Sequence, residues 1–272
     1  MPNSRLLIVE ADDELAQIMS LSLTRRGFQV TIAGDVATAL KMVCDSLPAV
    51  VLLDIDLPDL AGTELLKQLR DMPRTRHLPV IIVTQRARKP DRVASLELGA
   101  DDFILRPFDP DELGLRVQNL VARTTRDNLV NPHTGLPGHR ITLEETARAQ
   151  SEADAAILEL RLLHADEFRD FYGLLAYADL LRHIALLMGH ILNEAGASQD
   201  FVGQRDDELF VVITTPARAA QLRQTIVDRF AQDAIQHYGL AEPAGQQVKV
   251  RDSGGKEYLM PLVRLQATVL AG

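Results

Sequence analysis

Cysteine is almost absent from this 272-residue chain, and tryptophan is absent altogether. The single cysteine, Cys44, excludes an intrachain disulfide and a thiolate-rich metal site. An excess of positive charge is also missing, because 29 Lys and Arg residues stand against 38 Asp and Glu residues and the formal net charge is -9. Such a chain offers no broad positive field to a nucleic-acid backbone, so we expect no nucleic-acid partner.

The sequence also lacks the features of a secreted or membrane-spanning chain. Its first residues, MPNSRLLIVE, contain no charged leader followed by a long apolar core, and no apolar run approaches the length needed to span a bilayer. We therefore expect a cytoplasmic protein with no membrane partner. The hydrophobic share of 46% suffices for packed cores, and the length favours two domains.

The stretch AVVLLDIDLPDLAG, residues 49–62, joins a short apolar run to Asp54 and a set of turn residues. A run of this kind predicts a buried strand of a parallel sheet. Open α/β sheets place their sites at the carboxyl ends of such strands, so the Asp54 carboxylate would lie at that rim. By itself, Asp54 could equally be a cap for the next helix.

Strand and helix patterns alternate five times in the first half, which predicts a five-stranded, doubly wound parallel α/β sheet. We expect strands at residues 5–9, 28–33, 49–53, 79–84 and 102–105 and helices at 14–27, 35–43, 62–71, 90–98 and from 109 onward. Polar side chains follow four of these strands, namely Glu10 and Asp12, then Asp54, Thr84 and Arg106. Each one alone is explained as a cap or turn residue. Together they predict a phosphoryl-transfer site in which the acids hold Mg²⁺, Asp54 is the nucleophile, and Thr84 and Arg106 bind the transferred oxygens.

In the motifs VLLDIDLPDLAG, IIVTQ and GADDFILRPFDPDEL, the first half resembles the flavodoxin-like receiver domain of bacterial two-component response regulators. The resemblance covers about residues 4–122 and implies that Asp54 is the phosphoacceptor, with Thr84, Phe103 and Arg106 as phosphoryl-site or switch residues. It also implies a metal site, for which the candidates are Glu10, Asp12, Asp54 and the backbone carbonyl of Asp56. A sensor histidine kinase or another signalling protein would be the partner.

Two residues depart from the receiver pattern. Ala11 stands where the family has a second acid, and its loss should weaken Mg²⁺ binding because Mg²⁺ is held by few carboxylates. Arg106 stands where the family has a lysine, and its planar fork could form a standing pair with Asp54 that mimics or blocks the active state. A phosphorylation-independent pseudo-receiver scaffold is therefore an alternative.

The sequence divides into a receiver domain at residues 1–123, a helical connector at 109–131 that overlaps the last receiver helix, and a second domain at 132–272. Apolar residues on one face of the connector continue the last receiver helix. Receiver domains commonly pair through the face that bears this helix, so the resemblance favours a homodimer.

The second half has an α+β order with hairpins, and it resembles the nucleotidyl-cyclase-like GGDEF domain of diguanylate cyclases. The resemblance rests on NPHTGLPGHR at residues 131–140 and on KVRDSGGKEYLMPLVRLQATV at 249–269. We expect strands at 155–163, 200–204, 209–214, 248–251, 258–260 and 262–270, with helices at 143–151, 171–193 and 217–238.

The residues of the cyclase site are replaced throughout. The hairpin motif reads Asp206, Asp207, Glu208, Leu209 and Phe210, with aspartates where the family has two glycines that let the backbone approach GTP phosphates. The two metal-binding acids align with Leu209 and Arg161, and the guanine-contacting residues align with Arg169 and Ala178. In the product-inhibition motif Ala197 replaces the arginine, whereas the aspartate is kept as Asp200.

Two-metal chemistry needs its carboxylates, so we expect a degenerate GGDEF domain that is not an enzyme and binds no GTP. Its output would then be protein–protein contact. The alternative is a diguanylate cyclase that makes cyclic di-GMP from GTP with an atypical site. The acidic tip formed by Asp206, Asp207 and Glu208 is either an exposed hairpin end or a site for a cation or a basic partner.

Overall fold

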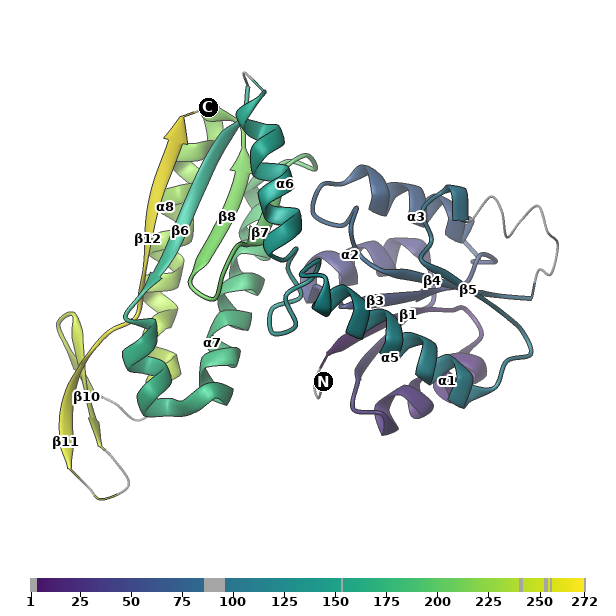
Figure 1. The fold of residues 1–272 in the computed structure, drawn as a ribbon, viewed down its shortest axis with the longest axis horizontal. Helices are drawn as coiled ribbons and strands as arrows, with labels where there is room; N and C mark the ends of the chain where they lie inside the picture. Colours follow the sequence, from purple (N-terminus) through teal and green to yellow (C-terminus); the bar gives the residue numbers. More distant parts are fainter. Residues whose placement is uncertain are drawn as a thin grey trace. The chain divides into compact units, whose positions relative to one another are not determined.

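The computed structural model describes residues 4–85, 96–152, 154–239, 242–251, 254 and 256–271 (Figure 1). The chain forms two compact units, Met1–Ile141 and Thr142–Gly272. The division falls inside helix α6 (His139–Gln150), downstream of the domain boundary that the sequence indicated at residues 131 and 132. The turn-rich motif at residues 131–138 therefore belongs to the first unit.

The first unit is built on a five-stranded parallel sheet with the strand order β2-β1-β3-β4-β5. The strands are β1 (Arg5–Val9), β2 (Gln29–Ala33), β3 (Val50–Leu53), β4 (Val80–Thr84) and β5 (Asp102–Leu105). All residues of β3 and β4 are buried, which explains why these strands are continuous apolar runs in the sequence. The predicted doubly wound sheet is confirmed.

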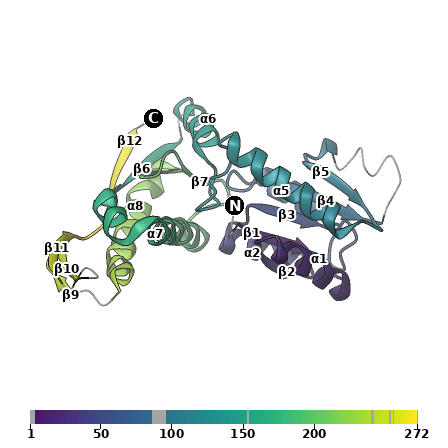
Figure 2. The ribbon, with the colours of Figure 1, turned by 60° about the horizontal axis from the view of Figure 1, so that its bottom comes forward.

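Helices cover both faces of this sheet (Figures 1 and 2). They are α1 (Asp13–Arg25), α2 (Val36–Ser46), α3 (Gly62–Asp71) and α5 (Pro110–Arg126). One core cluster lies between the sheet and α2 and α3, and a second lies between the sheet and α1 and α5. Aspartates at the N-caps of α1, α2 and α5 accept hydrogen bonds from the first-turn amides and fix where these helices begin. Most of the predicted helix at 90–98 lies outside the described residues.

The second unit contains a four-stranded antiparallel sheet with the order β12-β6-β8-β7. Its strands are β6 (Ala156–Leu163), β7 (Phe201–Gln204), β8 (Leu209–Thr214) and β12 (Arg264–Ala271). Helix α8 (Pro216–Asp233) packs on β12 and β6, and a short 3-10 helix η1 (Ala234–Tyr238) follows it. A separate sheet, β9 (Glu242–Ala244), β10 (Gln247–Arg251) and β11 (Glu257–Pro261), includes a short first strand that the sequence pattern did not indicate.

Helix α7 (Ala165–Ala195) begins six residues before its predicted start at residue 171. It kinks at Gly173, whose φ of 83° and ψ of 173° are not helical. The kink lies close to the predicted start at residue 171, so the turns before it were not recognised in the sequence.

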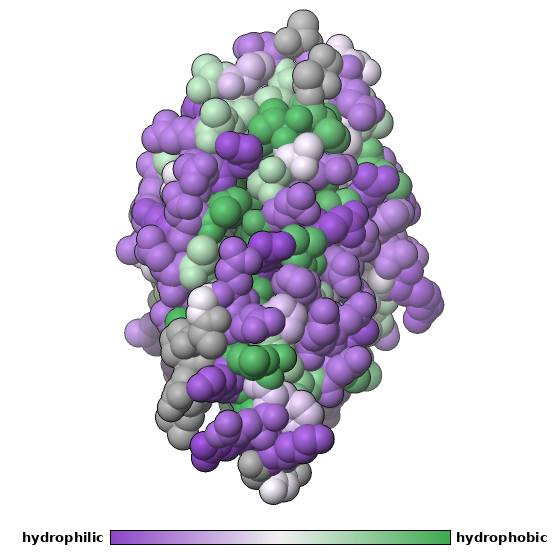
Figure 3. All heavy atoms as spheres, turned by 90° about the vertical axis from the view of Figure 1, so that its left-hand side faces the viewer, coloured by the Kyte–Doolittle hydropathy of each residue, from purple (hydrophilic) through white to green (hydrophobic). Residues whose placement is uncertain are grey.

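Among the described residues, α7 is long and apolar enough to cross a membrane by length and composition. The expectation that no segment approaches such a length therefore fails on this criterion. The criterion is weak here, because buried core helices also meet it and many α7 side chains are buried, including Leu180, Ile184 and Met188. On the face of the molecule drawn in Figure 3, apolar side chains form small separate patches among hydrophilic ones, as on ordinary protein surfaces.

Candidate functional site

Three strand ends bring Glu10, Asp54 and Arg106 together at one rim of the parallel sheet. Glu10 follows β1, Asp54 follows β3, and Arg106 follows β5. Carboxyl ends of parallel strands share one edge, which explains why residues almost a hundred positions apart meet there. Glu10 and Asp54 are 2% and 5% exposed, and Thr84 at the end of β4 is fully buried. We call the three charged residues Glu10, Asp54 and Arg106 the rim cluster.

Arg106 joins the two acids of the rim cluster. Its Nη2 donates to Glu10 Oε2 and to the carbonyl oxygen of Val83, the latter at 3.2 Å. The same nitrogen lies 3.5 Å from Asp54 Oδ2, which is an ion-pair distance. The peptide bond between Arg106 and Pro107 is cis. A buried cation thus lies between two buried carboxyl groups.

The two carboxyl groups of the rim cluster are not equally satisfied. Glu10 also accepts a hydrogen bond from the amide of Asp12 at 3.0 Å. Asp54 Oδ1 is buried and has no hydrogen-bond partner in the part of the chain that the structure describes. Burial raises the pKa of Glu10, although the Asp12 amide and the Arg106 charge oppose this shift.

The other residues predicted for this site have separate surroundings. Asp12 Oδ1 accepts from the amides of Glu14 and Leu15, both at 3.1 Å, and so caps α1 instead of joining the acids. Asp56 is exposed in the loop after β3, and Phe103 is buried in the core cluster beside α2 and α3. Within the described residues, no three His, Cys, Asp or Glu side chains gather as a metal site.

The loop between Asp54 and α3 closes back on itself. The amide of Gly62 donates to the carbonyl oxygen of Ile55 at 2.8 Å. A Cβ atom at Gly62 would overlap the carbonyl oxygen of Asp54, so only glycine fits there. This close approach fixes the backbone that carries the candidate phosphoacceptor.

Asp59 has a structural role that sequence reasoning missed. Its carboxylate accepts from the amide of Val36 at 3.0 Å and from that of Ala37 at 3.3 Å, at the N-terminus of α2. These backbone hydrogen bonds lower the pKa of Asp59. No local pattern marks this contact, because Asp59 lies 23 residues after Val36, whose amide it accepts from.

In the second unit, the two positions aligned with metal-binding acids face each other. Arg161 of β6 and Leu209 of β8 are directly paired in the antiparallel register. Leu209 is 5% exposed, whereas the side chain of Arg161 is half exposed with its Nη1 atom 3.9 Å from Glu208 Oε2. The structure therefore brings these positions together, but they carry a leucine and an arginine.

The turn between β7 and β8 is closed by its own side chains and by Tyr177 of α7. Asp206 Oδ1 accepts from the amides of Glu208 and Leu209 at 2.9 and 2.8 Å. The hydroxyl of Tyr177 donates to the carbonyl oxygen of Asp207 at 3.0 Å. Tyr177 is 5% exposed, and burial raises its phenol pKa above the usual value.

Arg169 and Asp200, two more residues singled out by the sequence, also have protein partners. The Arg169 guanidinium lies 5.7 Å from the centre of the Tyr177 ring and pairs with Asp166. Asp200 is 1% exposed and accepts from Thr214 Oγ1, from Arg218 Nη2 and from the amide of Ala197. Asp200 therefore stabilises the start of β7 and is not available to a ligand.

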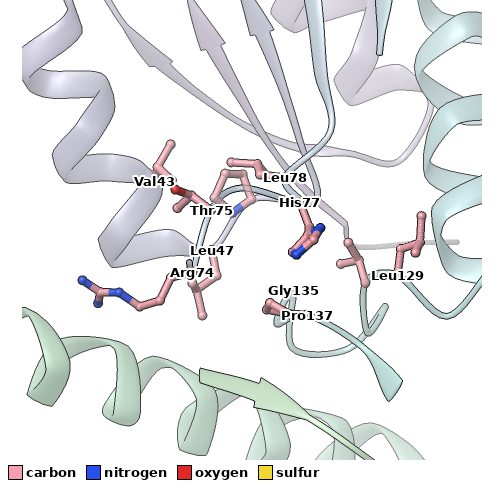
Figure 4. Close-up of a pocket in the computed structure, with 11 residues that line it drawn as sticks. Val43, Leu47, Arg74, Thr75, His77, Leu78, Leu129, Gly135 and Pro137 are labelled. Atoms are coloured by element: carbon pink, nitrogen blue, oxygen red, sulfur yellow. The ribbon is translucent and has the colours of Figure 1, made fainter. Parts of the chain in front are cut away.

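The turn-rich motif at residues 131–138 packs within the first unit (Figure 4). Arg5 Nη2 donates to the carbonyl oxygen of Thr134 at 3.0 Å. Gly135 has a φ of 79° and lies so close to the carbonyl oxygen of Leu47 that a Cβ atom would overlap it. The pocket between these segments has a volume of about 20 Å³, enough for one water molecule and not for an organic ligand.

Comparison with known proteins identifies a receiver domain in the first unit, which contains the rim cluster. Residues 6–118 match the family model described as the response regulator receiver domain. The chain is 36% identical to the response regulator PleD of Caulobacter vibrioides over 118 residues, which are 43% of this chain and 26% of PleD. It is also 36% identical to the phosphate regulon transcriptional regulatory protein PhoB of Escherichia coli over 44% of this chain and 52% of PhoB. The chain thus spans about a quarter to a half of the length of these relatives.

The match to the transcriptional regulatory protein CpxR of Escherichia coli is longer. The two chains are 32% identical over 209 residues, which are 74% of this chain and 81% of CpxR. Receiver domains generally bind Mg²⁺ at the phosphoacceptor site. The donors at this rim do not fit that ion, because Ala11 has no side-chain oxygen and Asp12 caps α1.

Proposed function

Because this chain belongs to the response regulators through its receiver domain, we propose that it relays a two-component signal with Asp54 as the phosphoacceptor. The position of Asp54 at the end of the central strand β3, inside the rim cluster, supports this proposal. A sensor histidine kinase or another cytoplasmic signalling protein would be the phosphoryl donor. Asp54 Oδ1 is buried, so the rim must open before this oxygen can attack phosphorus.

For the second unit, the function that the geometry supports best is that of a GGDEF-type domain without diguanylate cyclase activity. The observation that carries this proposal is the direct pairing of Arg161 and Leu209 across β6 and β8. Two-metal catalysis places carboxylates on both metal ions, and neither residue can bind one. The hydrogen bond from Tyr177 to Asp207 further closes the space between α7 and the turn, where a nucleotide would have to enter.

We propose that the output is protein–protein contact, made by a homodimer that pairs through the face bearing α5. This view follows from the family resemblance and from the loss of the cyclase residues. A transcriptional output, as in the names of CpxR and PhoB, is the weaker candidate because the chain carries a formal charge of -9. Binding to random duplex DNA at low salt would favour it over a protein-contact output.

The cyclase alternative is tested by titrating the full chain with GTP in the presence of Mg²⁺ by calorimetry. We expect no binding heat, and no cyclic di-GMP after prolonged incubation. A variant with both acids restored, Arg161→Asp with Leu209→Glu, shows whether the assay can detect a rebuilt site. Cyclic di-GMP made by the wild-type chain and lost in Asp207→Lys would establish the enzyme instead.

The phosphoacceptor assignment is tested with a small-molecule phosphodonor and intact-protein mass spectrometry. We expect a single phosphoryl adduct on the wild-type chain and none on Asp54→Asn. If neither protein carried an adduct while circular dichroism showed an intact fold, the result would support a phosphorylation-independent scaffold.

A further inference from the structure

The rim cluster already contains a buried cation beside Glu10 and Asp54, two of the acids that the receiver resemblance assigns to a metal. We propose that the guanidinium of Arg106 is the resident cation of this rim and takes the place of the divalent metal. The inference goes beyond the proposed function, because it holds whether or not Asp54 is phosphorylated.

The contacts of Arg106 Nη2 resemble those of a bound cation. This one nitrogen faces three oxygen atoms, Glu10 Oε2, Asp54 Oδ2 and the carbonyl oxygen of Val83. Its two hydrogens are used by Glu10 and Val83, and the remaining attraction to Asp54 at 3.5 Å is electrostatic. A single positive group thereby serves two acids that come from different strands.

Two of the side-chain donors expected beside Glu10 and Asp54 are missing or engaged. Ala11 supplies no side-chain oxygen, and Asp12 Oδ1 accepts two amide hydrogen bonds at the start of α1. Mg²⁺ requires oxygen ligands in near-octahedral geometry, and Arg106 already contacts both remaining acids, Glu10 and Asp54. A guanidinium has no such requirement, because it recognises carboxylates through directed N–H groups.

Burial makes this arrangement hard to displace. The side chains of Arg106, Glu10 and Asp54 are 10%, 2% and 6% exposed. A divalent ion at the same acids would lie within a few ångströms of the guanidinium, and two cations repel strongly where little water screens them. A metal ion at Glu10 and Asp54 therefore competes with Arg106 for the same two acids.

Metal binding by full-length variants tests the proposal. Free Mn²⁺ is followed by electron paramagnetic resonance, and Mg²⁺ is titrated by calorimetry. We compare the wild-type chain with Ala11→Asp, with Ala11→Asp/Arg106→Lys, and with Arg116→Lys. Arg116 is the matched control, because it pairs with Asp102 and Glu112 on the exposed side of α5.

We expect the wild-type chain, Ala11→Asp and Arg116→Lys to bind weakly, and the double variant to bind at least about tenfold more tightly. Mg²⁺ should also raise the melting temperature of the double variant alone, which confirms that it is folded and binds in the folded state. Tight binding by the wild-type chain would overturn the proposal. Full recovery in Ala11→Asp would do so as well, because the missing acid and not Arg106 would then be the cause.

Discussion

Each of the two units places an arginine beside acids at its candidate site, but in very different surroundings. In the first unit, Arg106 is 10% exposed and lies between two buried acids on neighbouring strand ends. In the second, Arg161 is 50% exposed and approaches Glu208 at 3.9 Å. The buried arginine is an integral part of its rim, whereas water can replace most of what the exposed one contributes.

The two sites also differ in whether their polar atoms are satisfied by the protein itself. The rim of the first unit keeps the candidate nucleophile Asp54, with one oxygen that has no hydrogen-bond partner in the described part of the chain. At the β7–β8 turn of the second unit, Tyr177 bonds the backbone and Asp206 bonds two amides. In the first site, Arg106 takes the role that we propose it has in place of a divalent metal. In the second site, side chains form hydrogen bonds with the backbone groups of the turn.

Replacing Arg106 and Arg161 one at a time should give the largest difference in stability between the two sites. Arg106→Met leaves Glu10 and Asp54 buried without a cation, and we expect a loss of about 3–5 kcal/mol of unfolding free energy. Arg161→Met removes a solvent-screened pair and should cost about 0–1 kcal/mol. Urea unfolding of the full chain measures both losses, and hydrogen exchange read by mass spectrometry assigns each one to its unit.

A second substitution checks the cause of the Arg106 effect. Glu10→Gln or Asp54→Asn in the Arg106→Met background removes one uncompensated charge and should recover part of the stability. If Arg106→Met and Arg161→Met lost equal amounts of unfolding free energy, burial of the arginine would not explain the difference between the sites. The same would follow if the double variants recovered no stability.

The loop that carries Asp54 offers the next largest effect. In Gly62→Ala the new Cβ atom would meet the backbone of Asp54, and we expect about 3 kcal/mol of destabilisation from the forced shift. Gly34→Ala is the matched control, because a Cβ atom there would lie 4.0 Å from its nearest neighbour, the carbonyl oxygen of Glu10. Thermal unfolding of both variants should show a clear loss for Gly62→Ala alone; similar losses would mean that the loop can relax.

The sequence predicted the receiver fold well, because its strands are short apolar runs and because Asp35 and Asp109 mark the starts of α2 and α5. It also predicted that Asp54 and Arg106 would share a rim, since the carboxyl ends of parallel strands lie at one edge of the sheet. It did not predict that Asp12 would cap α1, because an acid after a strand has the same signature as a metal ligand. Tyr177 was missed for another reason: its partner is a backbone carbonyl 30 residues away, and no local pattern marks such a contact.

The smallest effect concerns that tyrosine. Tyr177→Phe removes the hydroxyl that donates to the Asp207 carbonyl, and we expect a loss of about 1 kcal/mol from one hydrogen bond. Asp207→Asn keeps this backbone acceptor and should leave stability almost unchanged. Hydrogen exchange in peptides that cover residues 201–214 should increase for Tyr177→Phe and not for Asp207→Asn. If Tyr177→Phe instead left exchange unchanged, the turn would hold itself through Asp206 alone, and the second site would be closed by its own sequence rather than by α7.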